Sequence, residues 1–131
     1  MTYLLDVNAL IALGHAAHVH HEQVARWVAA LGASDVLATC SVTELGFVRI
    51  SPQARLSPDV AAARDLLAQL CRSTRPPFLR LTDDLGADAL PAWADTPAST
   101  TDGHLSALAS RRNARLVTLD RGIPDSLVVP S

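Results

Sequence analysis

The sequence predicts an α/β fold built around a central parallel sheet, and two observations support this class. Short apolar runs that suit buried strands alternate along the chain with segments whose apolar residues have helical spacing. Strands separated by helices are joined by crossovers, which connect parallel strands. The chain has 131 residues, of which 49% are hydrophobic. We therefore expect one domain, residues 1–131, with its own core.

The first third of the chain predicts two strands separated by two helices. Residues 3–5 form a short apolar strand, and residues 8–13 follow as a short helix. Residues 22–31 predict an amphipathic helix, because their apolar side chains recur at i, i+3, i+4 and i+7. Gly32 stands where a left-handed C-terminal cap is favoured, and residues 36–39 then predict a buried strand.

The middle of the chain predicts two helices with distinct start signals. Ser41 and Glu44 have the S-x-x-E spacing of a capping box, which indicates a helix through Ile50 that Pro52 ends. The Ser-Pro-Asp sequence that opens residues 57–72 supplies an N-cap, a proline for the first turn and an acid near the positive end of the helix dipole. We therefore predict a helix over that range as well.

The segment that follows predicts a strand, a short helix, a loop and a longer helix. Residues 78–81 form the strand, and Thr82 can cap a helix through Leu90. Residues 91–100 are rich in Pro, Ala, Asp, Ser and Thr, which is typical of a loop. Residues 102–112 have apolar helical spacing, and Asn113 suits the end of that helix.

The last part of the chain contains the clearest strand, at residues 115–119. Asp120, Arg121 and Gly122 then predict a turn. Residues 127–129 form a brief extended segment. Strand and helix therefore alternate to the end of the chain, as a parallel sheet requires.

Four acidic residues occupy the places where the chain changes direction, namely Asp6, Glu44, Asp102 and Asp120. Asp6 and Asp120 each follow a strand directly, and functional groups of parallel α/β sheets gather at the carboxyl ends of strands. Two unit charges ~4 Å apart repel by about 4 kcal/mol at an effective dielectric of 20. Carboxylate ligands alone favour Mg²⁺ or Mn²⁺ over zinc, so we predict such a site.

Each of these acids also has a purely structural explanation. Asp6 can cap the following helix, and Glu44 can serve only as the capping-box partner of Ser41. Asp102 repeats the same pattern three residues after a serine, and Asp120 can start a turn. The joint placement of all four favours the metal site over four separate structural roles.

Composition and charge exclude several classes of function. The formal net charge is −2 and all eleven cations are Arg, so any polyanion must bind a local patch. A receiver domain or a haloacid-dehalogenase-like phosphatase requires a lysine, and there is none. Cys40 and Cys71 lack zinc or disulfide spacing. The N-terminus resembles no signal peptide and no run could span a membrane, so we expect a soluble cytoplasmic protein.

A group of histidines, namely His15, His18, His20 and His21, permits two other readings. One is a zinc site, and the other is a metal-independent ribonuclease that uses a histidine pair as general acid and base. No cysteine lies nearby and the histidines straddle a turn and a helix start. Surface or helix-entry positions are therefore the simpler explanation, and the same holds for His104.

The segments around the four acids resemble the signature segments of the PIN-domain superfamily, specifically its VapC-type toxins. These segments are LLDVNALIAL, SVTELGFVRI, TTDGHLSALA and LVTLDRGI, and the stretch with His18, His20, His21 and Trp27 is similar to this group as well. The resemblance spans nearly the whole chain in the correct order. Residues 52–98 match only in general layout, so the choice of substrate does not transfer.

The resemblance implies a three-layer α/β/α fold and an endoribonuclease that depends on Mg²⁺ or Mn²⁺. Asp6 and Asp102 would ligate the metal, Asp120 would ligate it directly or through water, and Glu44 would orient the attacking water or hold a second ion. Water attack leaves a 5′-phosphate and a 3′-hydroxyl. Arg121 is our candidate for contacting the substrate phosphate, although it also suits an exposed turn.

The resemblance also implies partners. Such toxins bind RNA as substrate, form homodimers and are silenced by a small cognate antitoxin. A catalytically silent module with the same fold, which only holds RNA or a protein, remains the main alternative, together with the histidine-pair ribonuclease.

Overall fold

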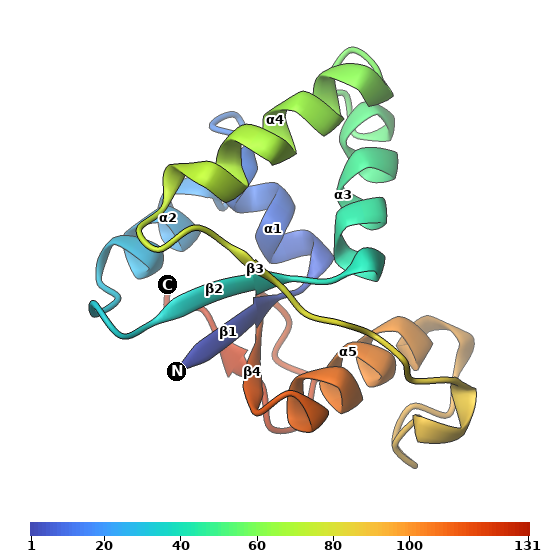
Figure 1. Cartoon of the computed structure of the whole chain (residues 1–131). Coiled ribbons are helices and arrows are strands. Elements are labelled where there is room, and N and C mark those ends of the chain that lie inside the picture. Colours follow the sequence, from blue (N-terminus) through green and yellow to red (C-terminus); the bar gives the residue numbers. More distant parts are fainter.

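Five parallel strands form one sheet in the order β3-β2-β1-β4-β5 in the computed structural model, which describes residues 1–131 (Figure 1). The strands are β1 (Thr2–Leu5), β2 (Val36–Thr39), β3 (Leu79–Arg80), β4 (Ala114–Thr118) and β5 (Leu127–Val128). In the centre of the sheet, Leu4 lies opposite Ala38 of β2 on one side and Leu116 of β4 on the other. The predicted parallel sheet is confirmed.

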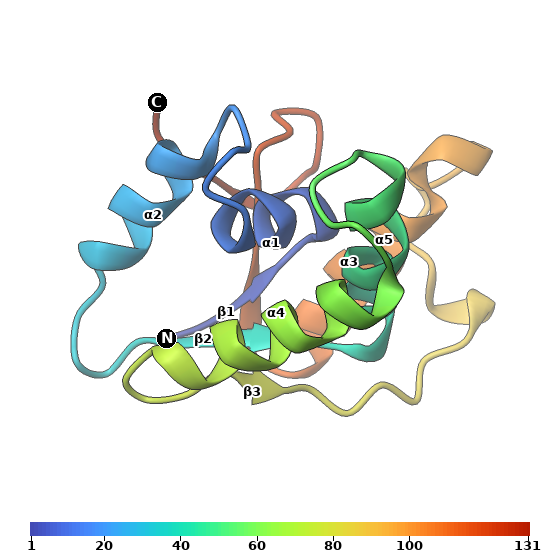
Figure 2. The same ribbon diagram turned by 90° about the horizontal axis from the view of Figure 1, so that it is seen from above.

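Helices cover both faces of the sheet, which confirms the three-layer α/β/α arrangement. They are α1 (Val7–Gly14), α2 (His21–Ala29), α3 (Ser41–Gln53), α4 (Val60–Ser73) and α5 (Thr100–Arg111), with short 3-10 turns η1 (Ala87–Ala89) and η2 (Pro97–Ser99). In Figures 1 and 2, α1 to α4 lie on one face and α5 lies on the other. No helix is long and apolar enough to cross a membrane.

The chain reverses its direction of travel across the sheet at β1. The first two crossovers carry it from β1 to β2 and on to β3, whereas α5 returns it past β1 to β4. The crossovers therefore leave from opposite faces on either side of the β1–β4 pair. In open α/β sheets, ligands bind outside the carboxyl ends of the strands at such a reversal. Asp6 follows β1 directly, and Asp120 follows β4 after one intervening residue.

The hydrophobic core is divided between the two faces of the sheet. Leu4 packs with Leu105 and Leu108 on the α5 side, whereas Leu5 packs with Leu10 and Phe47 on the opposite side. Successive strand residues point to opposite faces, so β1 needs apolar side chains on both faces. This requirement explains why the segment before Asp6 reads as a continuous apolar run.

Several helix ends differ from those predicted. The capping box of α3 pairs Cys40 with Thr43, one position before the predicted pair of Ser41 and Glu44. Pro52 lies inside α3 rather than beyond it. The preceding residue, Ser51, is buried and forms a 2.9 Å hydrogen bond with the His15 ring.

Two further caps and one helix also differ. Helix α4 is capped by Asp59 instead of Ser57, because the Asp59 carboxylate accepts the Ala62 N–H at 2.8 Å. Helix α2 ends at Ala29, and Gly32 does not adopt the left-handed conformation. Asn113 does adopt it, with φ of 53° after α5, as predicted.

The predicted helix from Thr82 to Leu90 was wrong, since only Ala87–Ala89 form a single 3-10 turn. The Asp83 carboxylate accepts the Leu85 N–H at 3.1 Å and also contacts His104 of α5. Local side-chain bonds of this kind compete with helix formation. The segment therefore runs as an irregular strap beside α5 (Figure 1).

Gly103 permits the close contact between this strap and the start of α5. A Cβ at Gly103 would lie 2.3 Å from the Ala94 Cβ and 3.4 Å from atoms of Leu90 and Pro91. We expect Gly103→Ala to lower the free energy of unfolding by about 1–3 kcal/mol, because a methyl group would overpack a filled contact. Urea unfolding measures this loss.

The matched control is Gly32→Ala. A Cβ at Gly32 meets only the Asp35 carboxylate, at an ordinary 3.5 Å, so this variant should be neutral or slightly stabilising. Equal losses in both variants would contradict the proposed contact.

Candidate functional site

Asp6 links the end of β1 to the start of α1. Its carboxylate accepts the Ala9 N–H at 2.8 Å and caps α1, and the residue is only 5% exposed. The structural role considered for this residue is therefore real. It also fixes one carboxylate at the reversal point of the sheet, because the helix cap and the adjoining strand hold the backbone on both sides.

Asp102 and Asp120 line one pocket of about 350 Å³ near this point. Asp102 lies in the first turn of α5, and Asp120 follows β4 after one intervening residue. The pairing considered between Ser99 and Asp102 does not form, since Ser99 instead bonds Thr96. Asp120 accepts the Gly122 N–H at 2.7 Å, which confirms its turn role.

The three carboxylates repel one another. Burial is the main cause that raises the pKa of Asp6 from 3.8 to about 6, and the charges of Asp102 and Asp120 add to it, against hydrogen bonds that lower it. Burial and the Asp120 charge also raise the pKa of Asp102. Three acids from distant parts of the sequence therefore lie within electrostatic range of one another, as the sequence predicts.

The carboxylates do not, however, already point at one centre. No three Asp, Glu, His or Cys side chains lie close enough together to hold one ion in their present conformations. Asp6 and Asp120 each turn an oxygen toward a backbone N–H of their own turn. The acids that were predicted to hold a metal are thus gathered by the fold, but their ligation of an ion stays a prediction.

Thr118 is a site residue that sequence reasoning missed. It is fully buried at the end of β4, its hydroxyl group lies beside the Asp6 carboxylate and lowers the pKa of that group, and the same oxygen accepts the Asp120 N–H at 2.9 Å. One side chain therefore ties two of the acids together. The sequence signal for it was a polar residue in an otherwise apolar strand, two positions before an acid.

Glu44 contacts none of the three aspartates through its hydrogen bond or its ion pair. Its carboxylate accepts a 2.6 Å hydrogen bond from Thr39 and pairs with Arg80 at 3.4 Å. It lines a different pocket, together with Cys71 and residues of α4. The burial of Cys71 and the Glu44 charge both raise the pKa of that thiol.

Arg121 is exposed in the turn after Asp120 and takes part in none of the ion pairs of the structure. Its position beside the carboxylate pocket is compatible with a contact to substrate. Its role stays a prediction.

The N-terminal histidines have structural contacts. The His15 ring stacks on Phe47 and bonds the Ser51 hydroxyl group at 2.9 Å. His18 accepts the His20 N–H, and His21 bonds a carbonyl of α1. These contacts hold the connection between α1 and α2. They therefore favour a structural role for the histidines over a general acid and base pair. No cysteine joins them in a zinc site.

His104 is not simply an exposed residue of α5. Its ring forms an ion pair with Asp83, and both side chains are mostly buried. Against the effect of burial, the hydrogen bond from His104 keeps the pKa of Asp83 below its usual value. The pair anchors the strap to the first half of α5, close in sequence to Asp102.

The comparisons with known proteins agree with this geometry. The model of the PIN domain family matches residues 3–125. Ribonuclease VapC38 of Mycobacterium tuberculosis is 41% identical over 123 residues, which cover 92% of this chain and 86% of that protein.

Two solved structures share the fold. The crystal structure of Mycobacterium tuberculosis VapC20, described as a Sarcin-Ricin loop cleaving toxin, has a TM-score of 0.69 at 17% identity, covering 98% of this chain and 99% of that one. VapBC2 from Rickettsia felis, bound to a DNA fragment from its promoter, has a TM-score of 0.64 at 14% identity and covers 98% and 97%. The family match and the identity to VapC38 show that the chain belongs to the PIN-domain family, in which its relatives are VapC ribonucleases.

Proposed function

We propose that the chain, as one nuclease domain, is a toxin endoribonuclease that depends on Mg²⁺ or Mn²⁺ and hydrolyses RNA phosphodiester bonds. The observation that carries the proposal is the gathering of Asp6, Asp102 and Asp120 at the β1–β4 reversal. The 41% identity to a named ribonuclease supports the same activity.

The side chains at this point suit a hard divalent cation. They offer only carboxylate and hydroxyl oxygens, which are the ligands that Mg²⁺ and Mn²⁺ prefer. Burial and, to a smaller extent, mutual repulsion raise the pKa of Asp6 and of Asp102, and a bound cation would offset both the burial and the repulsion of these charges. We assign Asp6, Asp102 and Asp120 as the residues that hold it.

When bound, the ion supplies an acidified water nucleophile and neutralises charge on the phosphate. Asp6 keeps one carboxylate fixed through its helix cap, and Thr118 aligns the turn that carries Asp120. We assign Glu44 to orienting water or holding a second ion, from its place at the end of β2, and Arg121 to the substrate phosphate.

We also propose that the protein acts in the cytoplasm, forms a homodimer and is neutralised by a small antitoxin. Likeness in fold to VapBC2 supports a partner of this kind. Co-expression with the product of a short overlapping upstream reading frame tests it, because a cognate antitoxin should co-purify and stop RNA cleavage.

The decisive experiment incubates purified protein with structured RNA in the presence of Mg²⁺ or Mn²⁺, with and without EDTA. We expect cleavage that EDTA abolishes, with products that carry a 5′-phosphate and a 3′-hydroxyl group. Cleavage that resists EDTA and leaves a 2′,3′-cyclic phosphate would support the histidine pair instead. RNA binding without any cleavage would support a silent module.

Thr118 offers a test of the site that does not depend on turnover. We expect Thr118→Val to weaken Mn²⁺ binding by about 10- to 100-fold, because it removes a hydrogen bond that orients two of the ligands. The rise in melting temperature on adding Mn²⁺ reports binding. Thr118→Ser keeps the hydroxyl group and should bind Mn²⁺ as the wild type does. Unchanged Mn²⁺ affinity in Thr118→Val would contradict the assignment.

A further inference from the structure

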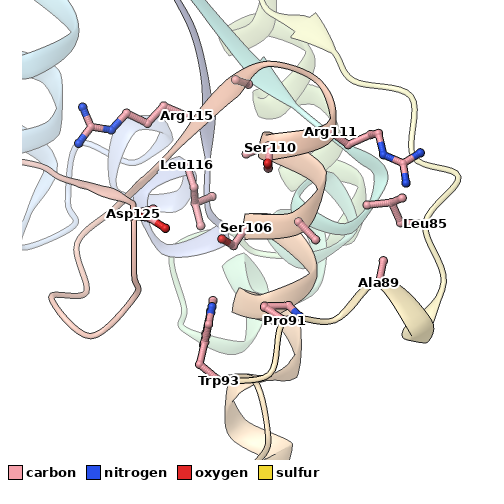
Figure 3. Close-up of a pocket in the computed structure, with 13 residues that line it drawn as sticks. Leu85, Ala89, Pro91, Trp93, Ser106, Ser110, Arg111, Arg115, Leu116 and Asp125 are labelled. Carbon is pink, nitrogen blue, oxygen red and sulfur yellow. The ribbon is translucent and has the colours of Figure 1, made fainter.

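Trp93 connects the pocket of Asp102 and Asp120 to a wider one along α5. This second pocket has a volume of about 650 Å³, and Trp93 lines both pockets. Figure 3 shows the Trp93 side chain directed along the side of α5 toward Ser106. The two hollows are thus neighbours that share an aromatic wall.

The far end of the second pocket carries two free cations. Arg111 and Arg115 are exposed, and the four ion pairs of the protein use other cations. In Figure 3, Arg111 extends from the end of α5 and Arg115 extends from β4 in the opposite direction. The adjacent Arg112 differs, because it bonds the Thr82 carbonyl and Asp84.

Polar side chains lie between these ends, among the apolar residues that line the pocket. Ser106 and Ser110 present hydroxyl groups along α5, and Asp125 is the only acid that lines the pocket. The lining therefore carries two positive charges and one negative charge, whereas the whole chain has a net charge of −2. A local excess of positive charge beside a carboxylate site favours a polyanion that spans both.

We propose that this α5 groove, defined by Trp93, Ser106, Ser110, Arg111 and Arg115, binds the single-stranded RNA that extends beyond the scissile phosphate. The proposal rests on the proposed ribonuclease function and deepens it. Trp93 stacks on a base, and the two arginines contact backbone phosphates. The serine hydroxyl groups are suited to phosphate or ribose oxygens.

The dimensions set the length of RNA that the groove can hold. From Asp102 to Arg111, α5 rises by about 13 Å at 1.5 Å per residue. Stacked nucleotides at about 3.4 Å spacing give roughly four nucleotides over that length. Stacking and phosphate contacts tolerate any base, so the α5 groove contributes affinity rather than sequence choice.

Charge disfavours a second copy of the chain as the occupant of this groove. In a symmetric contact, each Arg111 and Arg115 pair would meet only one Asp125 from the other copy. One guanidinium group on each side would then be buried without a partner, which is costly. Single-stranded RNA supplies a phosphate for each arginine.

The first test uses the two tryptophans as separate reporters. The chain has two Trp residues, so Trp27→Phe leaves Trp93 as the only emitter. Titration with a single-stranded RNA of about eight nucleotides in EDTA, which prevents metal-dependent cleavage, should quench Trp93 by stacking. Trp93→Phe leaves Trp27, which packs against Tyr3 in the other layer, and should show no quenching. Quenching in both variants or in neither overturns the proposal.

The second test replaces the two arginines. We expect Arg111→Gln with Arg115→Gln to weaken binding of the longer RNA by about tenfold and to reduce the salt slope of log Kd by about 1.4, at 0.7 per phosphate contact on a single strand. The KM for this RNA should rise. Arg26→Gln with Arg72→Gln is the matched control, since it removes equal charge from α2 and α4.

The outcomes separate this proposal from the ribonuclease activity itself. Equal weakening by the control pair, or an unchanged salt slope in the groove variant, overturns the groove even if wild-type protein cleaves RNA. Light scattering of the groove variant without RNA tests for a second copy of the chain at this surface. A change of oligomeric state would assign the surface to that copy and overturn the RNA groove. RNA binding that depends on Arg111 and Arg115 in a protein that cleaves nothing would support the groove and contradict the nuclease.

Discussion

Replacing Asp102 by Asn should lower the rate of RNA cleavage by about 100- to 1000-fold at saturating Mg²⁺. The amide has the shape of the carboxylate but no charge, so it cannot offset the charge of a divalent ion. The loss should appear in kcat, measured with a labelled RNA in single-turnover reactions. The fold should persist, because the substitution also relieves the repulsion between Asp102 and Asp120 that raises the pKa of Asp102.

Asp95→Asn is the matched control, since Asp95 lines the same pocket but is not one of the three acids. We expect this variant to keep at least the wild-type rate, because it removes an anion from the path of an anionic substrate. An Asp102→Asn variant that cleaves RNA at the wild-type rate would contradict the assignment of Asp102 as a metal ligand. Equal cleavage by both variants and by wild type would point to a contaminating nuclease.

Replacing Asp6 by Asn should stabilise the metal-free protein above pH 7 by about 3 kcal/mol. Folding raises the pKa of Asp6 from 3.8 to about 6, and each unit corresponds to about 1.4 kcal/mol. Asn caps a helix about as well as Asp. A raised pKa stabilises the fold of the wild type below pH 3.8, and this contribution is lost as the pH rises through about 6. The advantage of Asp6→Asn should therefore grow from near zero below pH 4 to its full size above pH 7.

Urea unfolding in EDTA across this pH range measures the difference. Added Mn²⁺ should then stabilise the wild type far more than Asp6→Asn, because the neutral side chain is a poorer ligand. Asp59→Asn is a useful control, since Asp59 also caps a helix but lies outside the acid group. A pH-independent difference between wild type and Asp6→Asn would contradict the role of burial and neighbouring charge.

The regular elements were predictable because their signals are local. The alternation of apolar runs located β2 at residues 36–39 with the correct ends, and the acids at strand ends followed from the expected parallel topology. Residues 91–100 were predicted as a loop and are largely irregular, whereas the irregular course of residues 82–90 was not predicted. The conformation of this segment depends on the contact of Asp83 with His104 of α5. No residue near Asp83 in the sequence indicates that contact.

The fold brings three of the predicted acids near one another, and their role as ligands stays a prediction, whereas the supporting residue Thr118 was not predicted. Asp6, Asp102 and Asp120 stand beside strong local signals, whereas Thr118 matters only because β1 and β4 pair in one register, with Leu5 opposite Val117. Glu44 follows the neighbouring strand β2, and its carboxylate contacts Thr39 and Arg80. Its role at the site stays a prediction. The partners of a side chain across a sheet depend on strand pairing and register, which the sequence alone does not determine.

The dependence of the site on both β1 and β4 has a consequence during protein synthesis. Asp6 is synthesised well before Thr118 and Asp120, and β4 pairs directly with β1. A nascent chain that ends before β4 therefore lacks Asp120 and the strand that places it beside Asp6. Under the proposed assignment, RNA cleavage begins only once β4 has been made and has paired with β1.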